Sequence, residues 1–445
     1  MALLKYLDEA PLKRFHIIIL IVAFLAYMLT ATNVMLISGI AKRICDVFKL
    51  STYELGILFS VGFIGMLIGA LLFGRLADII GRKWALIVAV LIHALFTALC
   101  GTATDYYQLM IYRFIAGVGL GGSLPIPGVY ISEYIPAKYR GTFVGLVETA
   151  WVWGAIISLF IPLIYLPILD WRGVFYWGLL ALIVVPLAII FLPESIRYLE
   201  EKGKTDKAIN ILKKHGIIAG EVSVKPIEIK RISWKDLFRG NYLQRTFLLM
   251  SLWFILVYTY YGVFLWLPRI LAEKFTLIGS ILWAMIITLA QIPGYYSAAF
   301  LLDRIGRKMV LGVYLILAAI GSIIVAFGDF FEVAIITVFG QPMGLILFAG
   351  FLMISFFNLG AWSGLYTYTP ELYPTEYRGT GSGIAAASGR AAGILAPYVT
   401  GYLLIGGSLI PAYTVFFLAH LIGGLLVFWM GIETKGLTLE EISEK

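Results

Sequence analysis

Charge is scarce in this chain: Asp, Glu, Lys and Arg together make up 13% of its 445 residues, and 61% are apolar. A soluble globular domain carries about 25% charged residues, so this balance excludes a soluble domain. The net charge of +8 would suggest a nucleic-acid partner, but the basic residues lie between long apolar runs. There they indicate membrane orientation. We therefore expect a lipid bilayer around the chain and no bound nucleic acid.

Cysteine and histidine are also rare. Both cysteines, Cys45 and Cys100, are expected near the outer face of the membrane. A disulfide between them is possible, although two unreactive thiols are the simpler expectation. The four histidines, at 16, 93, 215 and 420, are scattered, and His93 and His420 are expected to be neutral packing residues. We find no metal-ligand spacing, convergent nucleophile and base, or phosphate-binding loop. We therefore expect no catalytic residues, no metal and no cofactor.

Long apolar runs make up most of the chain. Twelve of them can reach the ~20 residues that a membrane-spanning helix needs. They lie at 15–40, 52–74, 84–103, 107–131, 142–168, 172–192, 244–271, 277–301, 308–327, 337–368, 380–404 and 409–431. The segments on one side hold most of the 34 Lys and Arg residues, and the other side holds Lys42, Arg43, Lys49, Arg172, Arg269 and Lys274. Since basic residues stay on the inner side, both termini are predicted to be cytoplasmic.

Three segments occur twice in the same order. The loop containing Asp78 and Lys83 returns at Asp303 and Lys308, 225 residues later. The segment from Glu133 to Thr142 returns at 371–380, and Glu194 is echoed more weakly by Glu433. Repeats of this kind are typical of transporters with a central site. We predict an all-α membrane protein of twelve helices in two six-helix, pseudo-symmetric halves at 1–193 and 243–431, with a linker at 194–242 and a cytoplasmic tail at 432–445.

The linker is the one long polar segment between spans. Apolar residues at helical spacing in Ser195–His215 predict an amphipathic helix, and Trp234–Phe238 could form another short helix. We expect this linker to lie against the inner membrane face. A flexible charged connector is the alternative.

These motifs strongly resemble the major facilitator superfamily over nearly the whole chain. The Asp-Arg-x-Gly-Arg-Lys loops, the Glu-x-x-Pro-x-x-Tyr-Arg-Gly segments and the tail Glu-Thr-Lys-Gly-Leu-Thr-Leu-Glu-Glu-Ile are like those of its sugar porters and organic-ion transporters. In the fold that this resemblance implies, spans one, two, four, five, seven, eight, ten and eleven border a central path. The polar groups inside the predicted spans all fall in that set: Asn33, Arg113, Glu148, Gln291, Asn358 and Arg390.

Arg390 is the strongest candidate for a site residue. It lies about ten residues into its span, roughly 15 Å from the inner end, and its small neighbours leave room for a planar guanidinium to bind a carboxylate. An intramembrane charge is by default a functional candidate, although a structural ion pair remains the alternative. The Gly-Arg pair in this place also resembles aromatic-acid, nicotinate and organic-anion transporters.

Glu148 is the candidate for proton coupling. It lies about six residues into span five, roughly 9 Å from the inner surface, so it either reaches the inner water or takes up a proton in desolvated surroundings. Its setting is similar to the fifth span of nicotinate porters. Arg113 matches the span-four arginine of the superfamily, with structural and coupling roles equally open. Asn33 stands where proton-coupled sugar porters carry an Asp, and an amide cannot carry the proton.

Aromatic residues supply candidate walls for a substrate cavity. Span seven holds Tyr258 and Tyr261 in a stretch similar to that of nicotinate and organic-ion transporters, and span ten holds Trp362. For any one aromatic residue, packing or an interfacial position is the common alternative. We expect these three to stack on a ring or hydrogen-bond a polar edge. Together with Arg390, Asn33, Gln291 and Asn358 they form the predicted substrate site.

The repeated inner motifs are interpreted as a cytoplasmic gate. Ion pairs between the halves would hold the inner side shut and break as the halves rock. Exposed pairs are individually weak, so the gate would act through number and geometry. Its predicted members are Asp78, Arg82, Glu133, Arg140, Asp303, Arg307, Glu371 and Arg378.

The hypothesis from sequence is a secondary transporter, a lone-chain monomer in the plasma membrane, moving a small organic anion with protons. The anion would be a carboxylate, with an aromatic carboxylate as one option. A sugar carrier is the alternative, supported by the Glu-Thr-Lys-Gly tail and by the amides of Gln291 and Asn358, which could bind hydroxyls. The glutamine-rich span-seven motif of sugar porters is missing, however. A non-transporting sensor on the same fold is the third reading.

Overall fold

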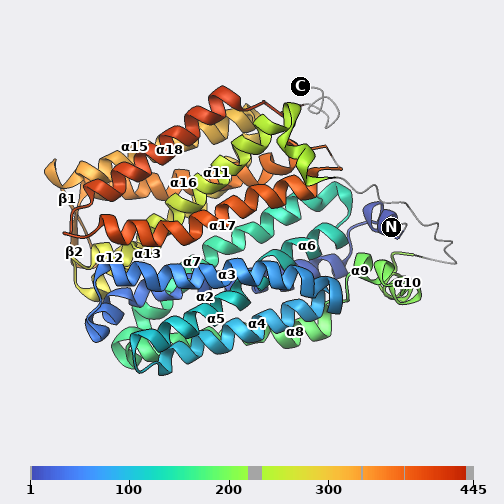
Figure 1. Ribbon diagram of the computed structural model, residues 1–445, viewed down its shortest axis with the longest axis horizontal. Coiled ribbons are helices and arrows are strands. Elements are labelled where there is room, and N and C mark those ends of the chain that lie inside the picture. Colours follow the sequence, from blue (N-terminus) through green and yellow to red (C-terminus); the bar gives the residue numbers. More distant parts are fainter. Residues whose placement is uncertain (1–2, 219–232, 332–333, 375, 437–445) are drawn as a thin grey trace. The chain divides into compact units, whose positions relative to one another are not determined.

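The computed structural model describes residues 3–218, 233–331, 334–374 and 376–436 (Figure 1). Parts of the predicted linker, at 219–232, and of the predicted tail, at 437–445, lie outside these residues. The helices of the first part of the chain are α1 Leu4–Asp8, α2 Arg14–Phe48, α3 Thr52–Ile80, α4 Arg82–Leu99, η1 Cys100–Thr102, α5 Tyr106–Ser123, α6 Pro125–Tyr134, α7 Ala137–Tyr176, η2 Trp177–Ile183 and α8 Val184–Phe191.

The elements that follow include the only two strands in the described residues. They are α9 Ile196–Glu201, α10 Thr205–Lys214, η3 Trp234–Phe238, α11 Gly240–Phe264, α12 Leu267–Leu271, α13 Leu277–Leu289, α14 Gln291–Ile305, α15 Arg307–Phe327, η4 Gly328–Phe330, β1 Ile335–Val338, β2 Gln341–Gly344, α16 Leu345–Glu371, α17 Arg378–Leu403 and α18 Ile410–Met430.

The chain divides into two compact units. Unit 1 comprises residues 1–37 and 61–229, and unit 2 comprises residues 38–60 and 230–445. The end of α2 and the start of α3 thus belong to unit 2, although the rest of both helices belongs to unit 1. Within unit 2, Ser38 donates a hydrogen bond to the Phe264 carbonyl (3.2 Å), and Ser60 donates one to the Ile394 carbonyl (2.7 Å).

Ten helices in the described residues are long and apolar enough to cross a membrane. They are Arg14–Phe48, Thr52–Ile80, Arg82–Thr102, Tyr106–Tyr134, Ala137–Phe191, Tyr242–Leu271, Leu277–Ile305, Arg307–Phe327, Leu345–Glu371 and Ile410–Met430. This set differs from the twelve predicted runs in two places, so twelve crossings stays a prediction.

The first difference is the 55-residue stretch Ala137–Phe191, which covers both the fifth and the sixth predicted run. Its helix is interrupted at Asp170, whose φ of 54° and ψ of −179° are not helical. The second is α17, a helix of 26 residues that falls on the eleventh predicted run but is not among the ten. Its many glycines, with Ser388 and Arg390, lower its hydropathy.

A two-stranded hairpin corrects the start of the tenth predicted run. Residues from 337 were expected to be helical, but β1 pairs antiparallel with β2, and the helix begins only at Leu345. Phe339 (φ 47°) and Gly340 (φ 75°) form the turn. Positive φ at both central residues matches the twist of a tight hairpin. The β-branched residues Ile335–Val338 favour a strand, a signal that average hydropathy hides.

The helices of unit 1 approach one another at glycines. A Cβ on Gly121 of α5 would lie 1.9 Å from the main-chain oxygen of Met66 in α3, so no larger residue fits while the two helices keep this spacing. Small residues allow such close contacts between membrane helices, where van der Waals packing drives association. Gly121 therefore allows the close packing of α5 on α3.

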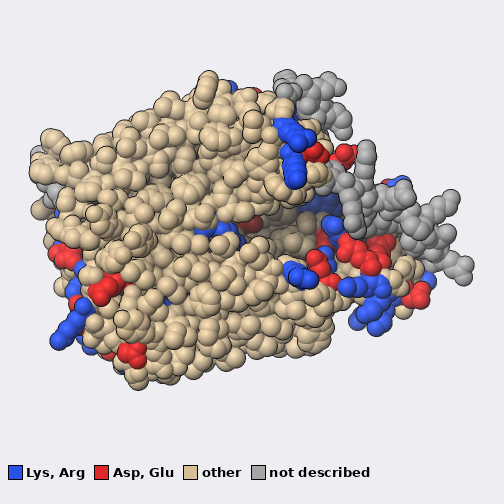
Figure 2. Space-filling view, viewed as in Figure 1, with Lys and Arg blue, Asp and Glu red and all other residues tan. Residues whose placement is uncertain are grey.

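In unit 2, α15 packs against α16 and α18, α11 against α17, and α14 against α16 (Figure 1). A Cβ on Gly294 of α14 would lie 2.1 Å from the Phe356 carbonyl of α16. Leucines of α11, such as Leu252 and Leu256, pack with Leu311 and Leu315 of α15 in the core cluster of this unit. Charged side chains gather toward the helix ends, and the surface between them is mostly uncharged (Figure 2).

The linker begins with two short helices in place of the single amphipathic helix predicted for Ser195–His215. Chain direction changes at Gly203, which has a φ of 68°, between α9 and α10. Leu199 in α9 and Leu212 in α10 are both buried, so the predicted apolar side does face the protein. Further along, η3 spans Trp234–Phe238, where a short helix was expected.

Candidate functional site

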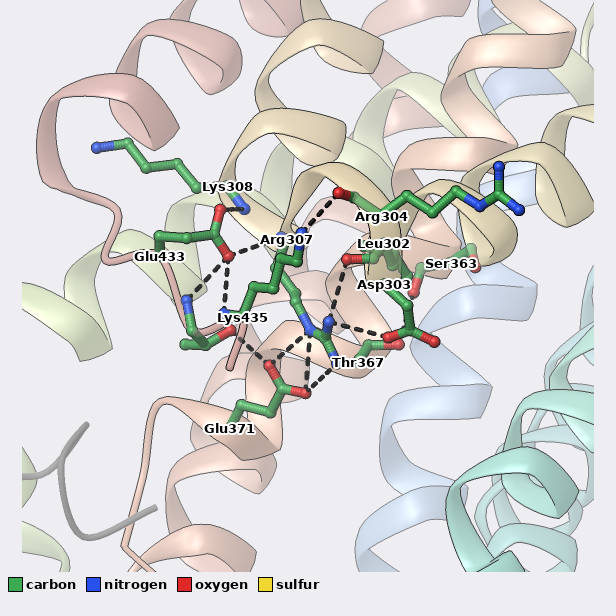
Figure 3. A network of polar contacts seen from close by, with 11 residues as sticks. Leu302, Asp303, Arg304, Arg307, Lys308, Ser363, Thr367, Glu371, Glu433 and Lys435 are labelled. Carbon is green, nitrogen blue, oxygen red and sulfur yellow. Dashed lines mark hydrogen bonds and ion pairs between the residues drawn. The ribbon is translucent and has the colours of Figure 1, made fainter. Parts of the chain in front are cut away.

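Arg307 is the centre of a polar network in unit 2 (Figure 3). Its guanidinium lies 3.0 Å from Asp303 and 3.2 Å from Glu371. It also donates a hydrogen bond to the carbonyl oxygen of Leu302 (3.1 Å). The Thr434 hydroxyl donates to Glu371 (2.6 Å). The planar guanidinium of Arg307 thus links the end of α14 to the end of α16. An arginine suits this position better than a lysine, because its planar group can bind two carboxylates at once.

Glu433 completes this network from the end of the described chain. Its carboxylate accepts hydrogen bonds from the main-chain N–H groups of Arg307 (2.9 Å) and Lys308 (3.1 Å) at the start of α15. The first N–H groups of a helix have no partner within it, and a negative charge there is favourable. Gly306, with φ 98°, leaves room for the carboxylate, since a Cβ would lie 2.3 Å from Glu433 Oε2.

The same contacts recur in unit 1. Arg82 Nη2 lies 3.3 Å from Asp78, and Arg82 Nε lies 3.9 Å from Glu133. The Ser195 hydroxyl donates to Glu133, as Thr434 does to Glu371. Glu194 accepts from the main-chain N–H groups of Arg82 (2.8 Å) and Lys83 (3.2 Å). Burial raises the pKa of Glu194, and the main-chain N–H groups that it accepts from oppose this rise.

Several predicted gate residues form ion pairs within their own unit. Arg82 pairs with Asp78 and Glu133, and Arg307 pairs with Asp303 and Glu371. Arg140 pairs with Asp8 of α1, and Arg378 donates to the Pro370 carbonyl (3.0 Å). Each network therefore braces the loop and helix ends of its own unit. A gating role for them stays a prediction.

Arg390 lies on α17, on a segment that is held against α11. The Ser388 hydroxyl donates to the Met250 carbonyl (2.7 Å), and a Cβ on Gly389 would lie 2.9 Å from Val257. Arg390 itself is half-buried, and no described carboxylate of unit 2 pairs with it. Its guanidinium is close enough to Tyr261 of α11 to act on that hydroxyl electrostatically.

The helix face of α17 that carries Arg390 has open positions. Gly383 lies seven residues before Arg390, close to two full turns, so the two residues share a face. A Cβ on Gly383 would meet no heavy atom within 4 Å, and the same holds for Gly379, one turn earlier. By contrast, Gly389 on the adjoining face is tightly packed. The guanidinium therefore starts from the less crowded side of the helix.

Glu148 of α7 is half-buried and accepts a hydrogen bond from the Tyr27 hydroxyl of α2 (2.9 Å). The ring of Tyr27 also meets Trp151 edge to face, with centroids 6.2 Å apart. Glu148 shares its face of α7 with Gly141 and Gly145, where a Cβ would meet nothing within 4 Å. This carboxylate thus has a defined hydrogen-bond donor and an uncrowded helix face.

Arg113 of α5 is buried, with 4% of its surface exposed. Its guanidinium donates only weakly, to the main-chain oxygens of Asn33 (3.3 Å) and Val34 (3.5 Å) in α2, and Nε has no acceptor among the described residues. No described carboxylate of unit 1 forms an ion pair with it. The structural and coupling roles of Arg113 both stay predictions.

Asn33 and Asn358 are each paired with a buried histidine. Asn33 Nδ2 lies 3.1 Å from His93 Nδ1 and donates to the Gly178 carbonyl (3.1 Å). Asn358 Nδ2 lies 3.0 Å from His420 Nε2 and donates to Thr259 (2.9 Å). Since an amide NH2 can only donate, each histidine accepts and is therefore neutral, which agrees with the expectation from sequence. Each amide group thus donates hydrogen bonds within its own unit, Asn33 in unit 1 and Asn358 in unit 2.

Gln291 stands at the break between α13 and α14. Its side chain is fully buried, and neither its amide nitrogen nor its amide oxygen has a hydrogen-bond partner in the described residues. Tyr258 is also buried; its ring stacks on Phe254 and meets Phe416 of α18 (centroids 5.9 Å). Tyr258 therefore faces the α18 side of α11, whereas Tyr261 lies near Arg390.

Trp362 of α16 belongs to an aromatic cluster that the sequence did not reveal. Its ring lies 5.4 Å from Trp253 of α11 and 5.4 Å from Tyr366 (centroid distances). Sequence reasoning also missed Tyr27. Neutral aromatic residues are common in membrane helices, so residue type alone marks neither Trp253 nor Tyr27. A hydrogen bond or a ring contact identifies them only once the helices are placed.

In the described residues no group of three or more His, Cys, Asp or Glu side chains could hold a metal ion. Cys45 and Cys100 are both buried free thiols. The polar groups that remain are guanidinium, carboxylate and amide groups on membrane helices.

The architecture and these sites define a membrane transporter. The family model described as "Sugar (and other) transporter" matches residues 17–445, and the chain belongs to this family of the major facilitator superfamily. It is therefore an integral, multi-pass transporter of small organic solutes and not an enzyme.

Two curated relatives align over almost the whole chain. The niacin transporter NiaP of Acinetobacter baylyi is 37% identical and covers 99% of this chain and 100% of its own. The putative niacin/nicotinamide transporter NiaP of Bacillus subtilis is 36% identical and covers 94% and 96%. Among solved structures, the xylose transporter XylE from E. coli has a TM-score of 0.76 at 20% identity and covers 96% of this chain and 100% of its own. That likeness shows the fold.

Proposed function

We propose that the chain is a proton-coupled symporter of an organic anion, specifically an aromatic carboxylate, working by alternating access between two halves. The observation that carries the proposal is Arg390, a guanidinium on a membrane helix without a carboxylate partner among the described residues of unit 2. The relatives named for niacin support it, since niacin is a pyridine ring that carries one carboxylate. A charge in apolar surroundings requires a counter-ion.

Arg390 would bind the substrate carboxylate through two parallel hydrogen bonds. A guanidinium offers the planar fork that a carboxylate fits. Ser388 and Gly389 hold this part of α17 on α11, so the arginine starts from a fixed backbone and less freedom is lost on binding. Tyr261, which lies near enough for Arg390 to act on its hydroxyl electrostatically, is a further residue that we assign to the site. Gln291, with both polar atoms unsatisfied, is the second polar contact that we assign to the site.

Glu148 would carry the coupled proton. As a carboxylate it accepts the Tyr27 hydrogen bond, and as a carboxylic acid it would lose the charge that is costly to move through a low-dielectric path. Asn33 cannot titrate, and the two buried histidines are held neutral by Asn33 and Asn358. We therefore assign these amides to helix packing, together with Arg113, and leave Glu148 as the group that exchanges protons.

Uptake into liposomes that contain the purified chain tests both assignments. Labelled pyridine-3-carboxylate should accumulate under an inward proton gradient. Arg390→Ala should raise the KM about 30-fold or more, as expected when one partner of a buried charge pair is removed. Glu148→Gln should abolish the response to the pH gradient while substrate exchange continues.

Matched controls separate these effects from misfolding. Arg304→Ala removes an arginine whose guanidinium lies over Phe300 at a helix end, and Glu201→Gln removes an exposed carboxylate of α9. Both should leave the KM and the pH response unchanged. Normal uptake by Arg390→Ala would refute the substrate site. An unaltered pH response in Glu148→Gln would refute the coupling role alone.

A sugar substrate is the second candidate, favoured by the description of the family model. Here the carboxamides of Gln291 and Asn358 would serve hydroxyl groups, but Asn358 is already bound to Thr259 and His420. A thermal-shift comparison of sugars with carboxylates distinguishes the two, because a ligand that binds the folded state raises its melting point. We expect carboxylates alone to raise it.

The setting that goes with this proposal is the plasma membrane, with both termini in the cytoplasm. The excess of Lys and Arg in the loops assigned to the inner side supports that orientation. Each chain would work as a monomer, because one fold of this kind contains its own pathway. Cysteine labelling from either side of the membrane would determine the orientation.

A further inference from the structure

Three aromatic rings of unit 2 form a cluster, which we call the aromatic triad: Trp253 of α11 with Trp362 and Tyr366 of α16. Trp253 meets Trp362 at 83° and Tyr366 at 90°, with both pairs of centroids 5.4 Å apart. Trp362 and Tyr366 lie one helical turn apart, and their planes differ by 34°. Trp253 thus makes edge-to-face contacts with both Trp362 and Tyr366, whose planes are tilted 34° to each other.

The orientation of Trp253 is held by hydrogen bonds. Its indole N–H donates to the Thr369 hydroxyl (3.0 Å), which in turn donates to the Leu365 carbonyl (2.7 Å). A tryptophan of the membrane interface turns its N–H toward water or lipid headgroups, whereas this one is satisfied within the protein. The orientation of Trp253 in the triad is therefore fixed by contacts within unit 2. All three rings are nonetheless only half-buried, so part of the cluster stays accessible.

The Trp253 ring of the triad packs against α17 at Gly389, the residue before Arg390. A Cβ on Gly389 would be 3.4 Å from Cε3 of Trp253, and Arg390 is the next residue. The Ser388 hydroxyl reaches the Met250 carbonyl, three residues before Trp253, so α17 and α11 are locked together at this level. The backbone of Arg390, which carries a permanent charge, therefore follows directly on the α17 position that contacts Trp253.

We propose that the aromatic triad binds the ring of a planar aromatic carboxylate whose carboxylate group binds Arg390. This deepens the proposed function and rests on it. Trp362 and Tyr366 provide the ring faces, and Trp253, in contact with both, is a positioning residue that holds them in this arrangement. A flat ring gains offset-stacked or edge-to-face contacts with these rings, and a puckered saturated ring does not. The triad thus makes the site selective for aromatic over saturated carboxylates.

The test compares the dissociation constants of pyridine-3-carboxylate and cyclohexanecarboxylate for the purified full chain. The wild type should bind the aromatic ligand about 10-fold more tightly. Trp362→Leu and Tyr366→Leu should each weaken aromatic binding by about 3- to 10-fold and leave saturated binding nearly unchanged, so that the selectivity falls. Trp362→Phe keeps a ring and should keep most of the selectivity. Trp253→Leu should act like Trp362→Leu although it leaves both stacking rings in place.

The control is Trp429→Leu, because Trp429 is 81% exposed at the end of α18. It should leave both constants unchanged. Equal binding of the two ligands by the wild type, or parallel losses for both in the triad variants, would overturn the ring site and leave the carboxylate site standing. If the wild type binds neither carboxylate, the proposed function fails and the ring site fails with it.

Discussion

The side-chain amide of Asn358 lies 3.0 Å from Nε2 of His420 and joins α16 to α18. On the other side of the ring, Nδ1 of His420 lies 3.3 Å from the Ser322 hydroxyl of α15. Asn358 also donates to Thr259 of α11. Four helices of unit 2 thus share one buried polar chain, which acts as a specific cross-brace in a bundle otherwise held by apolar contacts.

Replacing Asn358 should destabilise unit 2. Asn358→Ala leaves the acceptor nitrogen of His420 buried without a donor, at a cost of about 1–3 kcal/mol. We expect a lower unfolding midpoint in detergent. In the double variant with His420→Leu, the loss of stability should be smaller than the sum of the losses in the two single variants. Asn210→Ala, at an exposed position of α10, is the control. An unchanged midpoint in Asn358→Ala would show that the brace contributes nothing.

Arg307 should tolerate no substitution well. Arg307→Ala removes both ion pairs and leaves Glu371 with Thr434 alone, and Arg307→Lys retains the charge without the planar fork. The side chain of Arg307 is 16% exposed, so we expect a loss of about 1–3 kcal/mol of stability in the Ala variant and an intermediate loss in the Lys variant. The readout is thermal unfolding, with Arg304→Ala as the neutral comparison. Equal midpoints for all three variants would argue against a bracing role.

Two glycines of α17 should respond differently to the same change. Gly389→Ala places a methyl group 2.9 Å from Val257, which pushes α17 from α11 and displaces Arg390 and the aromatic triad. Overpacking of this kind costs about 1–3 kcal/mol, and substrate affinity should fall as well. Gly383→Ala meets nothing within 4 Å and should bind normally. Similar affinities for both variants would indicate that the α11–α17 contact does not position the site.

His215 should make stability depend on pH. Its ring stacks on Phe15 at 3.8 Å, and burial, assisted by Lys214, lowers its pKa. The neutral form is thus favoured in the folded state, so the stabilisation is complete above the usual pKa of about 6.5 and is lost as the pH falls below it. His215→Phe keeps the stack and cannot titrate. Its unfolding midpoint should change less between pH 7 and pH 5 than that of the wild type.

Much of the architecture could be predicted because apolar runs and charge asymmetry follow directly from the bilayer. The repeated acids and arginines form matching contacts within the two units, around Arg82 and Arg307, whereas the sequence predicted pairs between the halves, which stay a prediction. The hairpin at 335–344 was missed because its β-branched residues are as hydrophobic as a helix. The hydrogen-bond partners of the buried amides could not be predicted either. Asn33, for example, contacts His93, and this contact depends on how α2 and α4 pack.

The caps formed by Glu194 and Glu433 have a consequence for biosynthesis. Each carboxylate accepts hydrogen bonds from the first turn of a helix that lies more than a hundred residues earlier in the chain. The N-terminus of that helix is therefore capped by a residue that is synthesised much later. The opening turn of α15 therefore stays uncapped until residue 433 has been made and has folded back. A released chain that ends before residue 433 should still be recognised by quality-control proteases, whereas one that ends a few residues after it should resist them.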